Sequence, residues 1–224
     1  MTVEWDLWNE PNLAFFWIAP QSQYLEMWSI FYKKVRAAFP HQLIVGPSTA
    51  GGPESGGSTW WDEFLSYAKS LGELPDIYSW HDEPGSPVAE KQTFDNLLTK
   101  YGITNTRPVQ INEYGILAQQ NPGGGVWFIS QLSQAGADGL QGNWAGGQGL
   151  HNDMANLLTQ VDGQYEPLAE WWVFRGTFRT LTRSPFSNLG GPADSTVSRP
   201  LPETCRPPAK PPAWSRRSRT PRPR

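Results

Sequence analysis

Apolar residues follow two alternating patterns along the first 181 residues of the chain. Short apolar stretches of strand character alternate with longer stretches in which apolar residues return every three or four positions, the spacing of one helix face. The expected strands lie at about 3–8, 43–47, 76–81, 109–112 and 139–144, and the expected helices at about 21–39, 59–71, 88–101, 126–135 and 167–181. Repeated strand–helix units are typical of parallel sheets joined by right-handed crossovers.

An open doubly wound sheet and a closed eight-stranded barrel both satisfy this pattern. No glycine-rich phosphate-binding fingerprint follows any of the expected strands, which disfavours a nucleotide-binding sheet. The strands end instead in polar or aromatic residues, namely Glu10, Ser48, His81, Glu113 and Trp144. Because barrel active sites form at the C-terminal ends of the strands, the pattern favours an α/β barrel.

The charge distribution divides the chain into two segments. Residues 1–181 carry 9 basic and 19 acidic side chains, whereas residues 182–224 carry 9 basic and 2 acidic ones and hold 10 of the 21 prolines. The second segment has no apolar periodicity, and we expect a disordered tail. Arginine-rich tails can bind nucleic acids, but an end created by a retained intron or a shifted frame is the preferred interpretation. No nucleic-acid partner is therefore expected.

Several protein classes are disfavoured by composition. The only cysteine, Cys205, lies in the tail, so the chain has no disulfide framework. No apolar run is long enough to span a membrane, and the first residues do not form a signal peptide. The chain has 12 tryptophans and 13% aromatic residues, more than a core needs, which indicates that some of these rings line a surface cleft.

Two short motifs carry the candidate chemistry. Residues 8–12 read WNEPN and residues 111–115 read INEYG, and each motif places one glutamate at the end of an apolar, strand-like stretch. Two carboxylates at strand ends suit the cleavage of a glycosidic bond, in which one carboxyl group gives a proton and the other attacks. Indole rings near such a pair fit sugar substrates, because the face of a pyranose stacks on an indole.

The WNEPN and NEYG motifs resemble those of the clan A retaining glycoside hydrolases, most closely the family-39 group and its fungal relatives. The resemblance covers residues 1 to about 181 and implies a (β/α)8 TIM barrel. In that family the acid/base ends the fourth strand and the nucleophile ends the seventh, which implies these roles for Glu10 and Glu113. It also implies an incomplete barrel in which strands four to eight are present and strands one to three are missing. We therefore expect a C-terminal portion of an enzyme, with a catalytic domain at 1–181 and the tail at 182–224.

Four further residues are candidates for substrate binding. Asn9 is expected to hydrogen-bond the sugar 2-hydroxyl, although a turn asparagine can also bond its own backbone. The resemblance places His81 where the sixth strand carries a histidine facing the sugar, and Trp144 where the eighth strand carries a tryptophan under it. Tyr114 is also a candidate at the strand end, although alternation along an ideal strand points it away from Glu113.

These features together predict an enzyme of the O-glycosyl hydrolase class. We expect double displacement on β-linked oligo- or polysaccharides, a monomer with a carbohydrate substrate, no membrane partner, and secretion of the parent enzyme. No cofactor is expected, because no spaced His, Cys and Asp set indicates a metal, and no serine elbow is present. Asp82 and Glu83 are expected to form a solvated acidic loop. An inactive or carbohydrate-binding remnant of such an enzyme remains the alternative, because of the missing strands.

Overall fold

The computed structural model describes residues 3–53, 59–82, 85–104, 107–142 and 156–183. All of these belong to one unit of the chain, Met1–Arg183. Trp144 lies outside the described residues, as does nearly all of the tail expected at 182–224.

Five parallel strands form the central sheet. They are β1 (Glu4–Asp6), β2 (Leu43–Ala50), β3 (Ile77–Asp82), β4 (Val109–Tyr114) and β5 (Asp138–Gln141). Their order in the sheet is their order along the chain, and every neighbouring pair is parallel. A doubly wound sheet reverses its strand order at a switch point, so this uninterrupted order matches the barrel arrangement that the sequence predicts.

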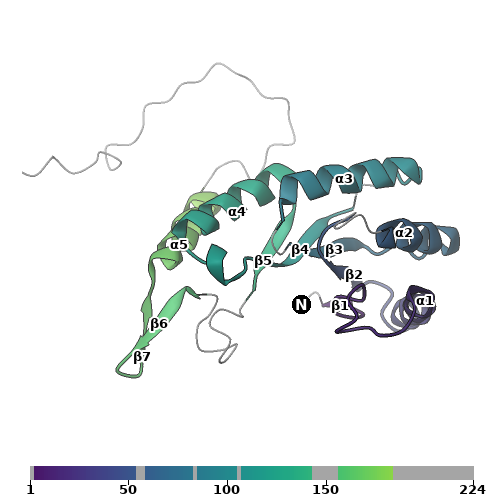
Figure 1. The fold of residues 1–224 in the computed structure, drawn as a ribbon, viewed down its shortest axis with the longest axis horizontal. Coiled ribbons are helices and arrows are strands. Elements are labelled where there is room, and N and C mark those ends of the chain that lie inside the picture. The colour runs from purple at the N-terminus through teal and green to yellow at the C-terminus, as the bar shows by residue number, and fades with distance from the viewer. Residues whose placement is uncertain (1–2, 54–58, 83–84, 105–106, 143–155, 184–224) are drawn as a thin grey trace, which may run out of the picture. The chain divides into compact units, whose positions relative to one another are not determined.

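Helices cover the outer side of the sheet (Figure 1). They are α1 (Gln21–Ala38), α2 (Trp60–Leu71), α3 (Pro87–Lys100), α4 (Pro122–Ala135) and α5 (Ala169–Arg183), with a short 3-10 helix η2 (Leu117–Gln119) before α4. Helix α5 packs against α4. Among the helices of the described residues, none combines the length and the apolarity that crossing a bilayer requires.

The hydrophobic core lies between the helices and the sheet and is rich in aromatic rings. Trp28 of α1 and Phe64 of α2 pack with their ring centroids 5.1 Å apart. Tyr78 and Trp80 of β3 are fully buried in the same cluster, whereas His81 points to the opposite face of the sheet. Strand alternation therefore separates core side chains from site side chains along β3.

The sheet curls, because strands that are not neighbours touch across its inner face. Gln110 Nε2 on β4 donates to Glu4 Oε2 on β1 over 3.1 Å, and Asn112 Nδ2 on β4 donates to Asp6 Oδ2 on β1 over 3.4 Å. Strands β2 and β3 lie between β1 and β4 in the sheet order. A flat sheet would hold β1 and β4 three strand spacings apart, so the strands form a curled partial barrel with polar inner side chains.

Helix α4 begins at Pro122, four residues before the predicted start. Asn121 caps it, since its Oδ1 accepts the amide of Gly124 at 3.1 Å. Proline suits the first helical position because an amide N–H there would have no acceptor within the helix, so none is lost. A Cβ on Gly124 would lie 1.9 Å from the carbonyl oxygen of Gln119, so the glycine is needed for this close approach.

The insertion after β5 contains a hairpin that the sequence analysis does not predict. Strands β6 (Leu158–Val161) and β7 (Gln164–Pro167) pair antiparallel. Asp162 and Gly163 join them with φ values of 49° and 76°, the left-handed pair that a two-residue hairpin turn uses. An Asp-Gly pair is a recognised hairpin signal, so the turn was readable from the sequence. The predicted last helix at 167–181 begins later, at Ala169.

Candidate functional site

Glu10 lies in the loop that follows β1. Its backbone is in the left-handed region, with a φ of 47°, which is uncommon for a residue other than glycine. Its amide donates to the carbonyl oxygen of Ser48 on β2 at 2.9 Å, and its own carbonyl accepts the amide of Leu13 at 3.0 Å. The first bond holds the glutamate against the end of the neighbouring strand, and the second closes a turn within its own loop.

His81 and Glu113 come from the C-terminal ends of β3 and β4. Ile111 pairs with Trp80, but the next pair joins His81 to Glu113, so Asn112 is an extra residue in β4. Such a bulge breaks the alternation of side chains and can re-aim a residue at a site. Asn112 and Glu113 consequently both reach the inner side of the sheet, although they are adjacent in sequence.

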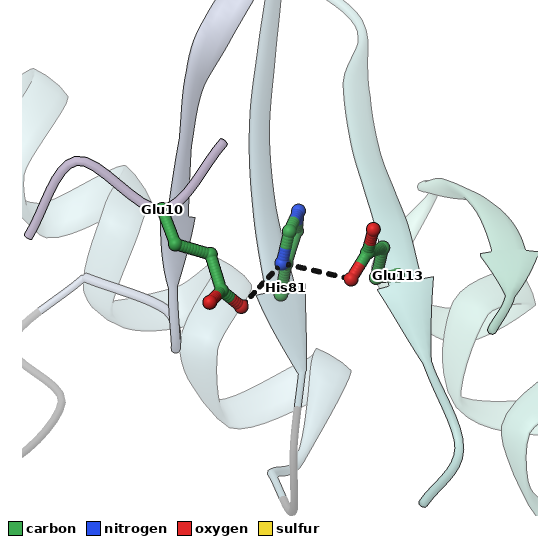
Figure 2. Close-up of side chains that lie close together, drawn as sticks. All are labelled: Glu10, His81 and Glu113. Carbon is green, nitrogen blue, oxygen red and sulfur yellow. Dashed lines mark hydrogen bonds and ion pairs between the residues drawn. The ribbon is translucent and has the colours of Figure 1, made fainter. Parts of the chain in front are cut away.

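The three side chains converge on one nitrogen atom. His81 Nδ1 lies 2.7 Å from Glu10 Oε1 and 3.3 Å from Glu113 Oε2, and Figure 2 shows the imidazole between the two carboxyl groups. One ligand atom of each residue lies within 4.8 Å of the others. The side chain of His81 is 2% exposed, that of Glu10 13% and that of Glu113 36%. The group is therefore anchored at the histidine and opens to solvent at Glu113.

The imidazole of His81 favours its neutral form. Burial lowers its pKa below the ordinary value, and the hydrogen bond and the charge of Glu10 offset part of that effect. A neutral imidazole carries one N–H, which donates to Glu10 when it is on Nδ1. One donor thus serves two carboxyl groups, and the shorter contact belongs to Glu10.

The donor atoms of Glu10, His81 and Glu113 are also of the type that binds a divalent metal ion. The sequence analysis finds no such set, because these residues are 71 and 32 positions apart and have no local spacing. All three are already used in one hydrogen-bonded group. Two carboxyl groups and an imidazole suit acid–base and nucleophilic chemistry without a metal.

A second polar tier lies directly beneath the three residues. Ser48 Oγ contacts Ser79 Oγ at 2.7 Å and accepts from Asn112 Nδ2 at 3.0 Å, and it donates to Asp6 Oδ2. One residue from each of β1, β2, β3 and β4 takes part. Barrel interiors are filled by such layers. None of these residues except Ser48 is singled out by the sequence analysis, because each reads as an isolated polar residue within its strand.

Asp6 is the charged residue of this tier. Desolvation raises the pKa of Asp6 to about 6, although hydrogen bonds from Ser48, from the amides of Leu7 and Trp8, and from Asn112 act in the opposite direction. The residue as a whole is exposed, but its carboxyl group faces a recess and has protein atoms on most sides. Crowding by protein atoms, not full loss of contact with water, causes the shift.

The recess lies on the inner face of the sheet. Its volume is about 400 Å³, and among its lining residues are Glu4, Asp6, Gln110, Asn112 and Asp138. It lies beneath the group of Glu10, His81 and Glu113. A second, shallow recess is lined by Asp6, Leu7, Trp8 and Asn9, in the loop that leads to Glu10.

The other predicted substrate-binding residues lie in different places. Asn9 is exposed in the loop beside Glu10, where a substrate can reach it. Tyr114 is not at the site: it is 3% exposed and packs on Phe128 of α4, with ring centroids 4.5 Å apart. Normal alternation resumes after the bulge, so Tyr114 points to the core and away from Glu113. Trp144 is outside the described residues.

Asp82 differs from the expected solvated loop. It is the last residue of β3 and is fully buried. A Cβ placed on Gly85 would lie 1.8 Å from Asp82 Oδ1 and 2.5 Å from Glu90 Oε1. The backbone at Gly85 therefore packs directly on these carboxyl groups and covers them.

No family model matches the chain. Among curated relatives, the chain is 28% identical over 147 residues to a 3-O-beta-L-arabinopyranosyl-alpha-L-arabinofuranosidase of Bifidobacterium pseudocatenulatum. It is 30% identical over 91 residues to a beta-xylosidase of Geobacillus stearothermophilus. These matches cover 63% and 40% of the chain, but only 14% and 17% of the two relatives.

Solved structures share the fold, among them that of a GH39 beta-xylosidase. A structure of N2152 from Neocallimastix frontalis has a TM-score of 0.61 and 26% identity over 76% of the chain. A GH39 beta-xylosidase from Caulobacter crescentus has a TM-score of 0.57 and 18% identity over 80% of the chain. The chain covers 41% of each of these structures. In fold, the chain resembles part of GH39 enzyme structures, and the curated relatives that it matches over part of its length are glycosidases.

Proposed function

We propose that the chain carries the catalytic pair of a retaining glycoside hydrolase. The observation that supports this most directly is the spacing of the carboxyl groups of Glu10 and Glu113, which have oxygens within 4.8 Å of each other. Retaining enzymes hold their two carboxyl groups about 5–5.5 Å apart, whereas inverting enzymes leave about 6.5–9.5 Å for a water molecule. The short spacing favours the retaining arrangement.

In this mechanism Glu113 attacks the anomeric carbon. The bond from that carbon to the leaving oxygen breaks as Glu10 gives the oxygen its proton, and a glycosyl ester of Glu113 forms. Glu10, now ionised, takes a proton from water, and the water oxygen attacks the same carbon and releases Glu113. His81 holds both side chains through Nδ1 but takes no part in bond making.

The proposed substrate is a β-linked oligo- or polysaccharide. Relatives named as beta-xylosidases make an aryl β-xyloside the first probe. Asn9, which is exposed beside Glu10, is the proposed hydrogen-bond partner of the sugar, and Trp8, which is 43% exposed two residues before Glu10, is the proposed ring for stacking. In the proposed correspondence, β1 is the fourth strand and β4 the seventh of an eight-stranded barrel, so the five strands are strands four to eight.

Azide rescue tests the two roles separately. In Glu10→Ala, an activated aryl β-xyloside still reacts with Glu113 to form the glycosyl ester, which is the first inversion. Azide, which needs no general base, then displaces Glu113 from the anomeric carbon in a second inversion, so the product is a β-glycosyl azide. In Glu113→Ala, azide attacks the substrate directly and gives the α-glycosyl azide after one inversion. Removal of the acid/base should slow cleavage of an unactivated substrate by about 10²–10⁴-fold.

Glu4→Gln is the matched control, since it removes an inner-face carboxylate below the site and should hydrolyse the substrate as the unaltered chain does. An α-azide from Glu10→Ala would contradict the assignment. So would full activity in Glu113→Ala.

A second candidate function is carbohydrate binding without turnover. It is favoured by the shallow recess lined by Leu7, Trp8 and Asn9, where the exposed ring of Trp8 can contact a sugar. In that case calorimetry detects xylo-oligosaccharide binding, no aryl β-xyloside is cleaved, and Trp8→Ala weakens binding while Glu113→Gln does not.

A further inference from the structure

The carboxyl group of Asp6 connects the two segments that carry the glutamates. On one side it accepts the amides of Leu7 and Trp8, which lead directly to Glu10. On the other side it accepts from Asn112 Nδ2 at 3.4 Å, the bulge residue that precedes Glu113. One carboxylate thus contacts the chain next to both members of the catalytic pair.

Ser48 makes the same connection through other atoms. Its carbonyl oxygen accepts the amide of Glu10 at 2.9 Å, and its hydroxyl accepts from Asn112 Nδ2 at 3.0 Å. It is 1% exposed and has a φ of 53°, a conformation that residues other than glycine keep only when surrounding contacts hold it. Those contacts are the hydroxyl of Ser79 and the carboxyl group of Asp6.

We propose that Asp6 and Ser48 are positioning residues that set the separation between Glu10 and Glu113. The expected effect on catalysis rests on the proposed function, whereas the expected effect on the positions of Glu10 and Glu113 does not. The hydrogen bonds of both residues run to the backbone of the loop after β1 and to Asn112, so each acts on the glutamates through these two segments.

The chemistry at Asp6 explains why a carboxylate is used there. All of its partners are donors: two amides, a hydroxyl and an amide NH2. Asparagine has nearly the same shape but replaces one acceptor oxygen with an NH2 group. In Asp6→Asn, at least one donor therefore faces another donor and loses its hydrogen-bond acceptor. We expect the loop after β1 to move and so separate the two donors.

The tier below supplies a matched control. Glu4 lies two residues before Asp6 on the same strand and accepts from Gln110 Nε2 at 3.1 Å, as Asp6 accepts from Asn112. Both carboxylates line the same recess. Glu4→Gln removes the same charge from the same face, but the hydrogen bond of Glu4 runs to Gln110 near the start of β4 and not to the loop after β1 or to the bulge.

Nitrogen NMR of the His81 ring measures the effect without requiring activity. The chain has 3 histidines, and His81→Gln assigns the signal. In Asp6→Asn and in Ser48→Ala, the His81 nitrogen shifts should change and its titration midpoint should fall. The fall is expected because Glu10 raises the pKa of His81, and a displaced Glu10 raises it less. Glu4→Gln should keep both the shifts and the midpoint of the unaltered chain.

Three outcomes overturn the proposal. The first is a folded Asp6→Asn or Ser48→Ala chain whose His81 signals are unchanged. The second is an equal change in Glu4→Gln, which would make the effect one of charge alone. The third is loss of the cooperative melt in both Asp6→Asn and Ser48→Ala, which would mean that these residues hold the fold and not the site.

Kinetics separate this inference from the proposed function. Asp6→Asn should lower kcat/KM more for a phenyl β-xyloside than for a dinitrophenyl β-xyloside, because only the phenyl leaving group needs the proton of Glu10. Equal losses on both substrates count against the positioning of Glu10. If the unaltered chain cleaves neither substrate, the proposed function fails for this chain, and the NMR result still decides the positioning role.

Discussion

Single residues on the inner face form three tiers, each with a carboxylate from the first 10 residues. Glu4 is paired with Gln110, Asp6 with Ser48 and Asn112, and Glu10 with His81. Each of these carboxylates thus has a polar partner on another strand of the sheet. Among the described residues, the top tier also brings Glu113 to the imidazole of His81, with 3.3 Å between Glu113 Oε2 and His81 Nδ1.

The raised pKa of Asp6 predicts a pH-dependent stability difference. Because its pKa is about 6 in the folded chain, above the ordinary aspartate value of 3.8, the folded protein binds this proton more tightly than the unfolded chain. Ionised Asp6 therefore destabilises the fold above about pH 6, and this loss is relieved as the pH falls toward about 4. Asp6→Asn does not titrate. The melting temperature of the unaltered chain relative to Asp6→Asn should accordingly rise between pH 7 and pH 4.5.

Thermal melts of both chains across this pH range check the prediction. The same melts of Glu4→Gln, which keeps Asp6, show how much of the change in melting temperature with pH comes from Glu4, a group other than Asp6. A difference between the unaltered chain and Asp6→Asn that is the same at every pH would contradict it.

At the level of helices and strands, irregularities at the strand ends position the site side chains. Close side-chain packing positions the helices on the sheet. Registers shift in β2 around Ser48 and in β4 at Asn112, and both shifts turn polar side chains toward the inner face. On the outer face, Trp28 of α1 packs directly on Gly46 of β2, where a Cβ would lie 2.6 Å from the indole ring. The indole N–H donates to the carbonyl oxygen of Glu73 at 2.9 Å, so the ring has little freedom to move.

Gly46→Ala should therefore destabilise the protein by about 1–3 kcal/mol, the usual cost of overpacking a core. Gly176→Ala is a control of opposite sign. Gly176 is within helix α5, and a Cβ added there would have nothing within 4 Å, so alanine should stabilise the protein by about 0.5–1 kcal/mol. Urea denaturation of both variants measures the two changes. Equal stability of Gly46→Ala and the unaltered chain would show that α1 can shift away from β2.

For the whole molecule, all buried hydrophobic residues of the described core lie between Tyr24 and Leu132. The unit that contains them, Met1–Arg183, is separate from Ser184–Arg224. The charge of the chain is divided at almost the same place, with an acidic first segment and a basic second one. The described core and the excess of basic side chains therefore belong to different parts of the chain.

Removal of residues 184–224 should leave the melting temperature unchanged, because the buried hydrophobic residues of the described core lie between Tyr24 and Leu132. Calorimetry of the full chain and of residues 1–183 compares the two directly. If the shortened chain loses its cooperative transition, residues 184–224 contribute to the fold after all. Salt-dependent binding to nucleic acid, tested on the same pair, would be confined to the full chain if the basic tail is a binding segment.

Local patterns in the sequence were enough to predict much of the fold. The five parallel strands and five helices lie close to their predicted positions, because apolar periodicity reflects which face of each element is buried. Glu10, His81 and Glu113 were identifiable because each ends or follows an apolar strand, and ends of parallel strands meet at one edge of a sheet. The Asp-Gly turn of the β6–β7 hairpin was equally local, although the sequence analysis did not use it.

The sequence by itself thus determined the order of elements and the residue types at the strand ends. Only the tertiary structure decided which side chains share the site. The bulge at Asn112 turns Glu113 inward and leaves Tyr114 in the core, and the curl of the sheet joins Asp6 to Asn112 across 106 positions of chain. The spacing of apolar residues shows which face of an element is buried. Bulges and sheet curvature arise from packing between strands that are distant in sequence, so a local pattern does not predict them.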